Sequence, residues 1–221
     1  MPPDARSRGT DAHRGGQGLS LPPASVTFPA SGVPHGAGGL AVAGERGSEE
    51  RLHVMTQIDL DARFDPRELR NVLGRFATGI AVVLGRDAEG PLGVTVNSFS
   101  SVSLDPPLIL FSMARSLQSL ARLEKLQFFT VNVLLEGQEE LSNRFARGGA
   151  DKFANLVLHE GHSGAPLLRP AHASFECAAY AHYDGGDHEI FVGRVVHFHA
   201  EGEGAPLIYY RGRYRSLTDP D

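Results

Sequence analysis

Two segments with strand-like sequences, 173–183 and 189–201, are separated only by Asp184-Gly185-Gly186-Asp187. Glycine and aspartate readily adopt the backbone conformations that a tight turn between antiparallel strands requires. Parallel neighbours would need a crossover of a dozen or more residues, for which there is no room here. The sequence therefore predicts a long β-hairpin and, with it, an antiparallel sheet.

Shorter segments with strand-like sequences precede and follow this hairpin. The predicted strands are 80–84, 93–96, 108–112, 128–135 and 207–211. Turn-forming residues at 86–91 make the first two strands a second hairpin. Residues 159–166 are expected to form an irregular, glycine-rich connection.

Three helices are predicted, one before the first strand and two between later strands. Asp65-Pro66-Arg67-Glu68 is a typical helix start, with an N-cap and a proline at the first helical position. Apolar residues at helical spacing then predict a face that packs on the core, and Gly79 is expected to end the helix. That face consists of Leu69, Val72, Leu73 and Phe76. The other helices are expected at 117–126 and 136–147. The fold class is therefore mainly β with α, an antiparallel barrel with two or three capping helices.

The most distinctive stretch covers residues 93–116 and reads GVTVNSFSSVSLDPPLILFSMARS. It predicts a strand, a serine-rich polar loop and a second strand that ends at Ser112. A helix is expected to begin at Leu117, with Ser116 as its N-cap and Arg115 beside it, which favours an anionic group such as a phosphate. A purely solvated loop would have a similar composition. The flanking apolar strands instead favour a position at the rim of a sheet, where a planar, half-polar ligand could bind.

This stretch closely resembles the flavin-binding segment of the flavin reductase-like family. The similarity extends from residue 64 to residue 217 and includes FATGIAVVL, TVNSFSSVSLDPPLILFS, ADKF, GDHEIFVGRV and LIYYRGRY, in that order. Members of that family fold as FMN-binding split β-barrels of the antiparallel, Greek-key type. The resemblance implies such a domain at residues 60–217.

The resemblance also implies which residues hold the flavin. Those along the ring and the ribityl chain would be Thr95, Val96, Asn97 and Ser98. Those near the phosphate would be Ser112, Met113, Ala114, Arg115 and Ser116. Others would line the neighbouring edge or hold the phosphate or ring edge: Asn132, Val133, Arg147, Lys152, Phe153 and, as aromatic cover, Tyr214. Without the resemblance, Lys152 and Phe153 would be read as a solvated loop and a docking side chain.

A catalytic role is implied for His188. The family pattern GDHxxxxGxV is intact from Gly186 to Val195, and in the family its histidine lies over the flavin on the nicotinamide side. An imidazole there could hydrogen-bond NADH, and Gly193 would permit close approach of a stacked cofactor. Without the resemblance, His188 would be a polar turn residue.

The implied activity is that of an NAD(P)H-dependent flavin reductase, which transfers hydride from NADH or NADPH to FMN or FAD and supplies reduced flavin to a partner monooxygenase. A homodimer is implied, because family members place the flavin near the subunit interface. The alternatives are a non-catalytic flavin-binding protein and a relative of the pyridoxamine phosphate oxidases. The sequence leaves open the choice of FMN or FAD, of NADH or NADPH, and of flavin as co-substrate or retained group.

Composition limits the other possibilities. The formal net charge of the 221-residue chain is −5, which does not favour nucleic-acid binding. The single cysteine, Cys177, excludes an intramolecular disulfide and is expected to be a buried strand residue. No apolar run approaches the roughly 20 residues of a membrane span, so a cytoplasmic protein is expected. Residues 1–54, with 10 glycines and 6 prolines, are expected to be a disordered extension, with Met55 as an alternative start.

Several other chemistries lack their motifs. Neither GxGxxG nor GxxxxGK[ST] occurs, so a nicotinamide cofactor would have to bind over the flavin itself. The sequence GHSGA at 161–165 lacks the last glycine of a serine hydrolase elbow. His197 and His199 share one face of a predicted strand, and His159 and His162 are three positions apart. No carboxylate lies at matched spacing in the same run, so no metal ligand is predicted.

Overall fold

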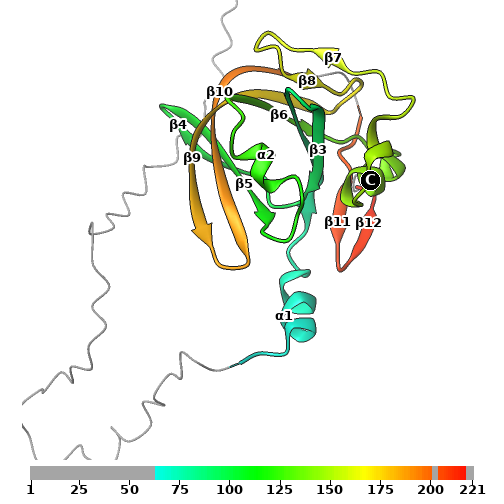
Figure 1. Ribbon diagram of the computed structural model, residues 1–221. Helices are drawn as coiled ribbons and strands as arrows, with labels where there is room; N and C mark the ends of the chain where they lie inside the picture. Colours follow the sequence, from blue (N-terminus) through cyan, green and yellow to red (C-terminus); the bar gives the residue numbers. More distant parts are fainter. Residues whose placement is uncertain (1–62, 201–203, 218–221) are drawn as a thin grey trace, which may run out of the picture. The chain divides into compact units, whose positions relative to one another are not determined.

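A computed structural model of the protein describes residues 63–200 and 204–217 (Figure 1). Its main feature is a seven-stranded antiparallel sheet with the strand order β3-β2-β6-β9-β10-β5-β4. The strands are β2 (Ala81–Asp87), β3 (Gly90–Val96), β4 (Ser100–Leu104), β5 (Pro107–Ala114), β6 (Phe128–Val133), β9 (Ala173–Gly185) and β10 (His188–Ala200). Figure 1 shows them curling around helix α2 (Leu120–Leu123) into an open barrel. The predicted antiparallel barrel with helical additions is confirmed.

The predicted long hairpin forms the middle of this sheet. Its pairing runs from His188 opposite Gly185 to Ala200 opposite Ala173, with two register shifts along the way. Strand β6 pairs with β9 on one side, and β5 pairs with β10 on the other. The hairpin therefore brings residues from its turn and from its open end next to different neighbouring strands.

The curled sheet closes near Ser98, just after edge strand β3. The Ser98 hydroxyl accepts a hydrogen bond from the Ser112 backbone N–H at 2.9 Å and donates to the Ser112 carbonyl at 3.2 Å. Ser112 lies in β5, the second strand from the opposite edge. One side chain thus joins two parts of the sheet that the strand order separates.

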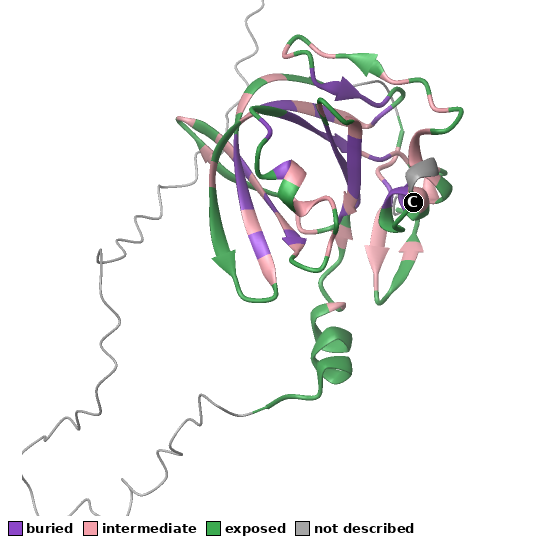
Figure 2. Ribbon diagram, in the orientation of Figure 1, coloured by how far each residue is buried: buried purple, intermediate pink, exposed green. Residues whose placement is uncertain are grey.

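Strand β2 shows why the barrel has two cores. Its first five residues are all buried, because apolar groups cover both of its faces. Ala81 and Val83 face the barrel interior, whereas Val82 and Leu84 face a second cluster that includes Phe145 of helix α3 (Glu139–Ala146). Figure 2 shows the buried residues concentrated along these central strands.

Small β-structures lie outside the main sheet. Strands β1 (Thr78–Gly79), β11 (Ile208–Tyr210) and β12 (Arg213–Arg215) form a three-stranded sheet, and β7 (His159–Glu160) pairs with β8 (Pro166–Leu167). The prediction of a wholly irregular connection at 159–166 was therefore wrong, and β12 was missed. Strands of two or three residues leave too little periodicity for a sequence to show them.

Helix α1 (Pro66–Leu73) begins as predicted, since the Asp65 carboxylate accepts a hydrogen bond from the Arg67 N–H at 2.7 Å. The predicted end at Gly79 was wrong, because the helix stops at Leu73 with Gly74 as its C-cap. The prediction that its apolar face packs on the core was also wrong. Exposed fractions on that face run from 45% for Leu69 to 79% for Phe76, and Figure 2 shows α1 exposed along its length. Helical spacing defines an apolar face but does not say what covers it.

The stretch at 93–116 also differs from the prediction. Residues 100–104 are not a loop but strand β4, which pairs with β5. No helix begins at Leu117, because Ala114 and Leu117 accept the backbone hydrogen bonds of successive turns. Helix α2 starts only at Leu120 and is one turn long. Ser116 is therefore a turn residue and caps no helix, which removes the predicted helix-end site for a phosphate.

The prediction of disorder for residues 1–54 lies outside the described residues. Among the helices that the structure describes, none is both long enough and apolar enough to span a membrane. The predicted burial of Cys177 in a strand is confirmed, since it lies in β9 with no exposed surface. Burial, together with the charge of Glu176 beside it, raises the pKa of the Cys177 thiol to about 12.

Candidate functional site

The turn of the β9–β10 hairpin lies against the end of strand β5. His188 pairs with Ala114, and the Arg115 backbone N–H donates a hydrogen bond to the Asp187 carbonyl at 2.9 Å. Through Ser112, the same strand also contacts Ser98. The structure therefore brings together three predicted parts of the site: the residues after β3, the end of β5 and His188.

Arg115 links the hairpin turn to β10. Its guanidinium lies 3.2 Å from a carboxylate oxygen of Glu189 and 3.5 Å from one of Asp184, and its Nε donates to the Gly186 carbonyl at 3.0 Å. The hydrogen bond from the Gly186 N–H and the charge of Arg115 hold the pKa of Asp184 below its usual range. Because these groups already engage Arg115, the structure shows it shaping the turn, and its contact with a phosphate stays a prediction.

His188 is oriented by its neighbour in the chain. Its Nδ1 lies 2.6 Å from Oδ1 of Asp187, and its side chain is about half exposed. This hydrogen bond and the charge of His188 lower the pKa of Asp187. A carboxylate on Nδ1 leaves Nε2 to face a ligand, which is the usual way in which a second group fixes an imidazole tautomer.

The other end of the candidate site lies at helix α3. The Thr95 hydroxyl donates to the Ser142 carbonyl at 2.7 Å, and the Tyr214 hydroxyl lies 3.0 Å from both Ser142 Oγ and Asn143 Oδ1. Predicted residues from β3 and β12 thus meet at the same helix. The segment 95–98 connects this end of the site to the contact between Ser98 and Ser112.

A basic groove opens beside α3. It has a volume of about 710 Å³, and its lining includes Arg144, Arg147 and Lys152. The Lys152 ammonium donates two long hydrogen bonds, of 3.3 Å to the Gly93 carbonyl and 3.4 Å to the Phe145 carbonyl. Partial burial lowers the pKa of Lys152. The lining also includes Glu140, which lies 3.9 Å from Arg144, so Arg147 and Lys152 are the cationic groups that suit an anionic group such as a phosphate.

Asn132 is not brought to this surface. It is fully buried, its amide N–H groups donate to the Val82 carbonyl and the Thr130 hydroxyl, and its oxygen accepts from the Leu168 N–H. All of these partners belong to the protein. The structure thus gives Asn132 a role in joining strands, and its predicted position along a flavin edge finds no support.

Three other predicted residues face the core with their side chains. Val96 and Met113 are buried in the barrel interior, and the Phe153 ring packs edge-on against Phe145 at a centroid distance of 5.3 Å. At Val96 and Met113, only backbone groups are left to contact a ligand.

Residues 73–218 match a protein-family profile described as a flavin reductase like domain. The chain belongs to this family. The match covers every residue predicted to bind the cofactor, from Thr95 to Tyr214. The match also confirms the family resemblance that the sequence motifs indicated.

The chain is similar to reductases from bacteria. The chain is 45% identical over 152 residues to a probable flavin reductase of Rhizobium meliloti (strain 1021), covering 68% of this chain and 49% of that protein. It is 39% identical over 157 residues to the reductase subunit HsaB of a flavin-dependent monooxygenase of Rhodococcus jostii (strain RHA1), covering 71% and 80%. The chain thus spans about half the length of the first relative and most of the second.

A solved structure has the same fold. The NADH:FAD oxidoreductase SgcE6 of Streptomyces globisporus C-1027, in complex with NAD and FAD fragments, aligns with a TM-score of 0.66 and 38% identity. The alignment covers 72% of this chain and 98% of that one. All strands of the main sheet described above lie within residues 73–218 of the family match.

The sequence of this flavin reductase-like domain did not predict that one group of polar residues lies close together. His162, Glu176 and His197 converge at the open end of the β9–β10 hairpin. Glu176 and His197 are distant in sequence, but they are opposite each other in the pairing of β9 with β10. Only a correct hairpin register could have shown that a carboxylate accompanies these histidines.

Proposed function

We propose that this protein is an NAD(P)H-dependent flavin reductase that reduces FMN or FAD and releases it to a partner monooxygenase. The observation that carries the proposal is the family match over residues 73–218, which includes the whole candidate site. Relatives described as an NADH-dependent FMN reductase and as an NADH:FAD oxidoreductase support the same chemistry. Relatives described as reductase components of monooxygenases support the partner.

The residues at the candidate site fit a flavin. A phosphate would lie in the groove with Arg147 and Lys152, and polar groups of the segment from Thr95 to Ser98 would face the ribityl chain and ring. When bound, the flavin supplies the hydride acceptor, and the nicotinamide supplies the hydride. The protein therefore needs to bind and orient two ring systems and to keep water away from them.

His188 is proposed to orient the nicotinamide. Asp187 fixes the imidazole through Nδ1, and Arg115 holds the turn on which both residues lie. Nε2 can then hydrogen-bond a carboxamide or a phosphate oxygen of NADH. No proton has to be transferred by the side chain, because the cofactors carry out the hydride transfer and the protein has to orient them.

The proposed reaction is tested by mixing the protein anaerobically with NADH and FMN and recording the absorbance of both. The expected result is loss of NADH and of oxidised flavin in equal amounts, with repeated turnover. Flavin binding without NADH oxidation would instead identify a non-catalytic flavin-binding protein. Repeating the assay with FAD and NADPH determines the preferred pair.

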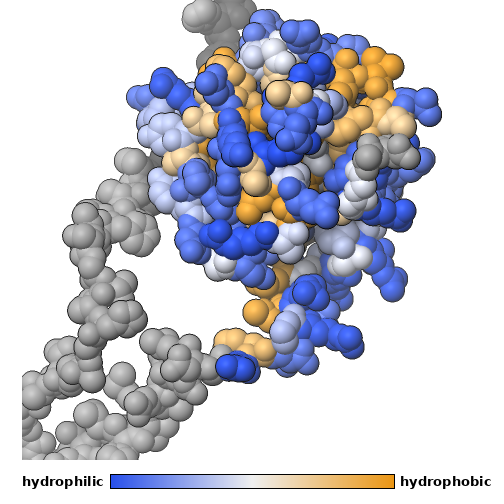
Figure 3. All heavy atoms as spheres, in the orientation of Figure 1, coloured by the Kyte–Doolittle hydropathy of each residue, from blue (hydrophilic) through white to orange (hydrophobic). Residues whose placement is uncertain are grey.

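We also propose a homodimer, in which a second copy covers helix α1. The exposed residues Leu69, Val72, Leu73 and Phe76 form an apolar face that no described element buries, and Figure 3 shows apolar surface around this helix. A Val72→Glu variant should then shift the species observed in analytical ultracentrifugation from dimer to monomer. A wild-type monomer at micromolar concentration would contradict this proposal.

The reductase domain is proposed to be residues 60–217, with residues 1–54 as an extension outside it. The family match, which begins at residue 73, supports this division. Deletion up to Met55 should leave the melting temperature and the reductase turnover nearly unchanged.

A further inference from the structure

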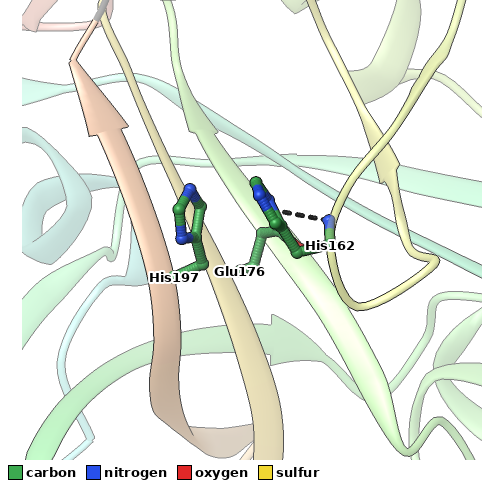
Figure 4. A group of neighbouring side chains, drawn as sticks. All are labelled: His162, Glu176 and His197. Atoms are coloured by element: carbon green, nitrogen blue, oxygen red, sulfur yellow. Dashed lines mark hydrogen bonds and ion pairs between the residues drawn. The ribbon is translucent and has the colours of Figure 1, made fainter.

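Three potential metal ligands converge at the open end of the β9–β10 hairpin, from three separate segments. His197 lies on β10, Glu176 on β9, and His162 on the loop between β7 and β8 (Figure 4). One ligand atom of each residue lies within 4.8 Å of the other two. Figure 4 shows the two imidazole rings side by side, next to Glu176.

The spacing of these groups suits a small divalent cation. The distance between His162 Nδ1 and Glu176 Oε1 is 3.3 Å, and the two imidazole centroids are 3.9 Å apart. Zinc binds histidine nitrogen and carboxylate oxygen at about 2.0–2.2 Å, so two ligands of a tetrahedral site lie about 3.4 Å apart. Small side-chain rotations would therefore be enough to bring all three onto one ion.

The carboxylate is already buried and ordered. Glu176 is only 2% exposed, and the backbone N–H groups of His162 and Ser163 donate to it at 3.1 and 2.8 Å. The Ser163 hydroxyl also donates to it, at 2.7 Å. These hydrogen bonds fix the position of the carboxylate before any metal binds.

The loop that carries His162 fits tightly over this anion. A Cβ atom on Gly161 would lie 2.6 Å from Glu176 Oε2, so only glycine permits this approach. A cavity of about 150 Å³ adjoins the group, and its lining includes Glu160 and Arg169. Three histidines also line the cavity, and with their imidazoles neutral, as metal ligands must be, two carboxylates against one guanidinium would leave an excess of negative charge that favours a bound cation.

We propose that His162, Glu176 and His197 form a binding site for a divalent transition metal, with Zn²⁺ favoured by the two-nitrogen, one-oxygen ligand set. A fourth position would be left for water or hydroxide. Bound metal ties the β7–β8 loop to the hairpin. His197 is nine residue steps along the strand from His188, a length of about 30 Å along the chain, so the metal site is distinct from the turn proposed to bind the nicotinamide.

The rival account is a simple ion pair, in which a protonated His162 neutralises Glu176. The two accounts make different predictions. Only a metal site binds Zn²⁺, and only a metal site requires His197 for that binding. The test uses the full chain after removal of any histidine tag and after dialysis against a chelator. Zn²⁺ is then titrated calorimetrically, and Co²⁺ is used to record the visible absorption of a tetrahedral site.

The expected result is one Zn²⁺ per chain for the wild type. His162→Ala and His197→Ala should each weaken binding by at least about a hundredfold, because loss of outer-shell groups alone costs about 10–100-fold. His199→Ala is the matched control, since His199 lies on the same strand and lines the same cavity but is outside the ligand group. It should bind within about threefold of the wild type.

Melting temperatures provide a second readout. The His162 side chain is 75% exposed, so its removal should not prevent folding. Zn²⁺ should raise the melting temperature of the wild type and of His199→Ala but not that of His162→Ala. Absence of saturable binding in the wild type, or equal binding by all four proteins, would overturn the proposal in favour of the ion pair.

Discussion

The two ends of the β9–β10 hairpin both contain a buried carboxylate next to histidine, but they stabilise it differently. At the turn, Glu189 contacts His182 and lies 3.2 Å from the Arg115 guanidinium. At the open end, Glu176 is held by backbone N–H groups, a hydroxyl and His162. The Arg115 guanidinium is a permanent positive charge beside Glu189. The imidazole beside Glu176 has no permanent charge and can instead bind a metal ion.

This difference separates the two proposed activities. The permanent ion pair fixes the turn on which His188 lies. The open end keeps three ligand atoms close together and has an adjoining cavity. We therefore expect substitutions at the open end to affect stability and metal binding, and substitutions at the turn and the basic groove to affect cofactor use.

The largest effect is expected for Glu176→Gln, measured with a chelator present. Weaker hydrogen bonds from His162 and Ser163 to a neutral amide should lower the free energy of unfolding by roughly 2–3 kcal/mol. Urea denaturation measures this loss. Glu160→Gln, an exposed change on β7, is the control and should be neutral. A Glu176→Gln protein as stable as the wild type would show that the carboxylate does not hold the loop.

Lys152→Ala should weaken FMN binding by about ten- to hundredfold, through loss of a charge-assisted contact worth roughly 1.5–3 kcal/mol. Because Arg115 is engaged at the turn, the basic groove is left as the phosphate site. Fluorescence titration with FMN and riboflavin separates the phosphate contribution, since riboflavin lacks the phosphate. Lys125→Ala, outside this groove, is the control. Equal losses for both flavins would place Lys152 away from the phosphate.

His188→Ala should lower kcat/KM for NADH by at least roughly tenfold, about 1.4 kcal/mol of transition-state stabilisation. Flavin affinity should stay within about threefold, because the imidazole is proposed to contact the nicotinamide and not the flavin. Steady-state kinetics at saturating flavin, with a separate flavin titration, measures both quantities. A parallel loss of flavin affinity would mean that His188 helps to form the flavin site itself.

The smallest effect is expected at Cys177, beside Glu176 in β9. With a pKa raised to about 12 by burial and by the Glu176 charge, the thiol should not react with iodoacetamide at a pH of about 8 in the native protein. Mass spectrometry of native and urea-unfolded samples tests this. Rapid alkylation of the native protein would show that the open end of the hairpin opens readily.

The sequence was most informative where local chemistry determines the structure. The turn Asp184-Gly185-Gly186-Asp187 predicted the central hairpin, and Asp65-Pro66 predicted the start of α1, because turns and caps depend on a few adjacent residues. The family pattern GDHxxxxGxV, read with the hairpin, placed His188 at its turn. Its position next to the end of β5 follows from strand order, which the sequence does not contain.

Predictions that depended on distant contacts were less successful. The apolar face of α1 was visible, but its lack of a partner within the described chain was not. Ser116 has good N-cap chemistry, yet turn hydrogen bonds at Leu117 and Leu120 take the place of a helix. The pairing of Glu176 with His197 depends on a hairpin with two register shifts, each of which moves a side chain relative to its partners.

The most direct test of the account is stopped-flow reduction of flavin-loaded protein by NADH, compared for wild type, His188→Ala and His199→Ala. These histidines lie near opposite ends of the same strand. We predict that reduction slows by at least roughly tenfold in His188→Ala and is unchanged in His199→Ala. Reduction of His188→Ala at the wild-type rate, with the same dependence on NADH concentration, would contradict the assignment of nicotinamide binding to the turn of the hairpin.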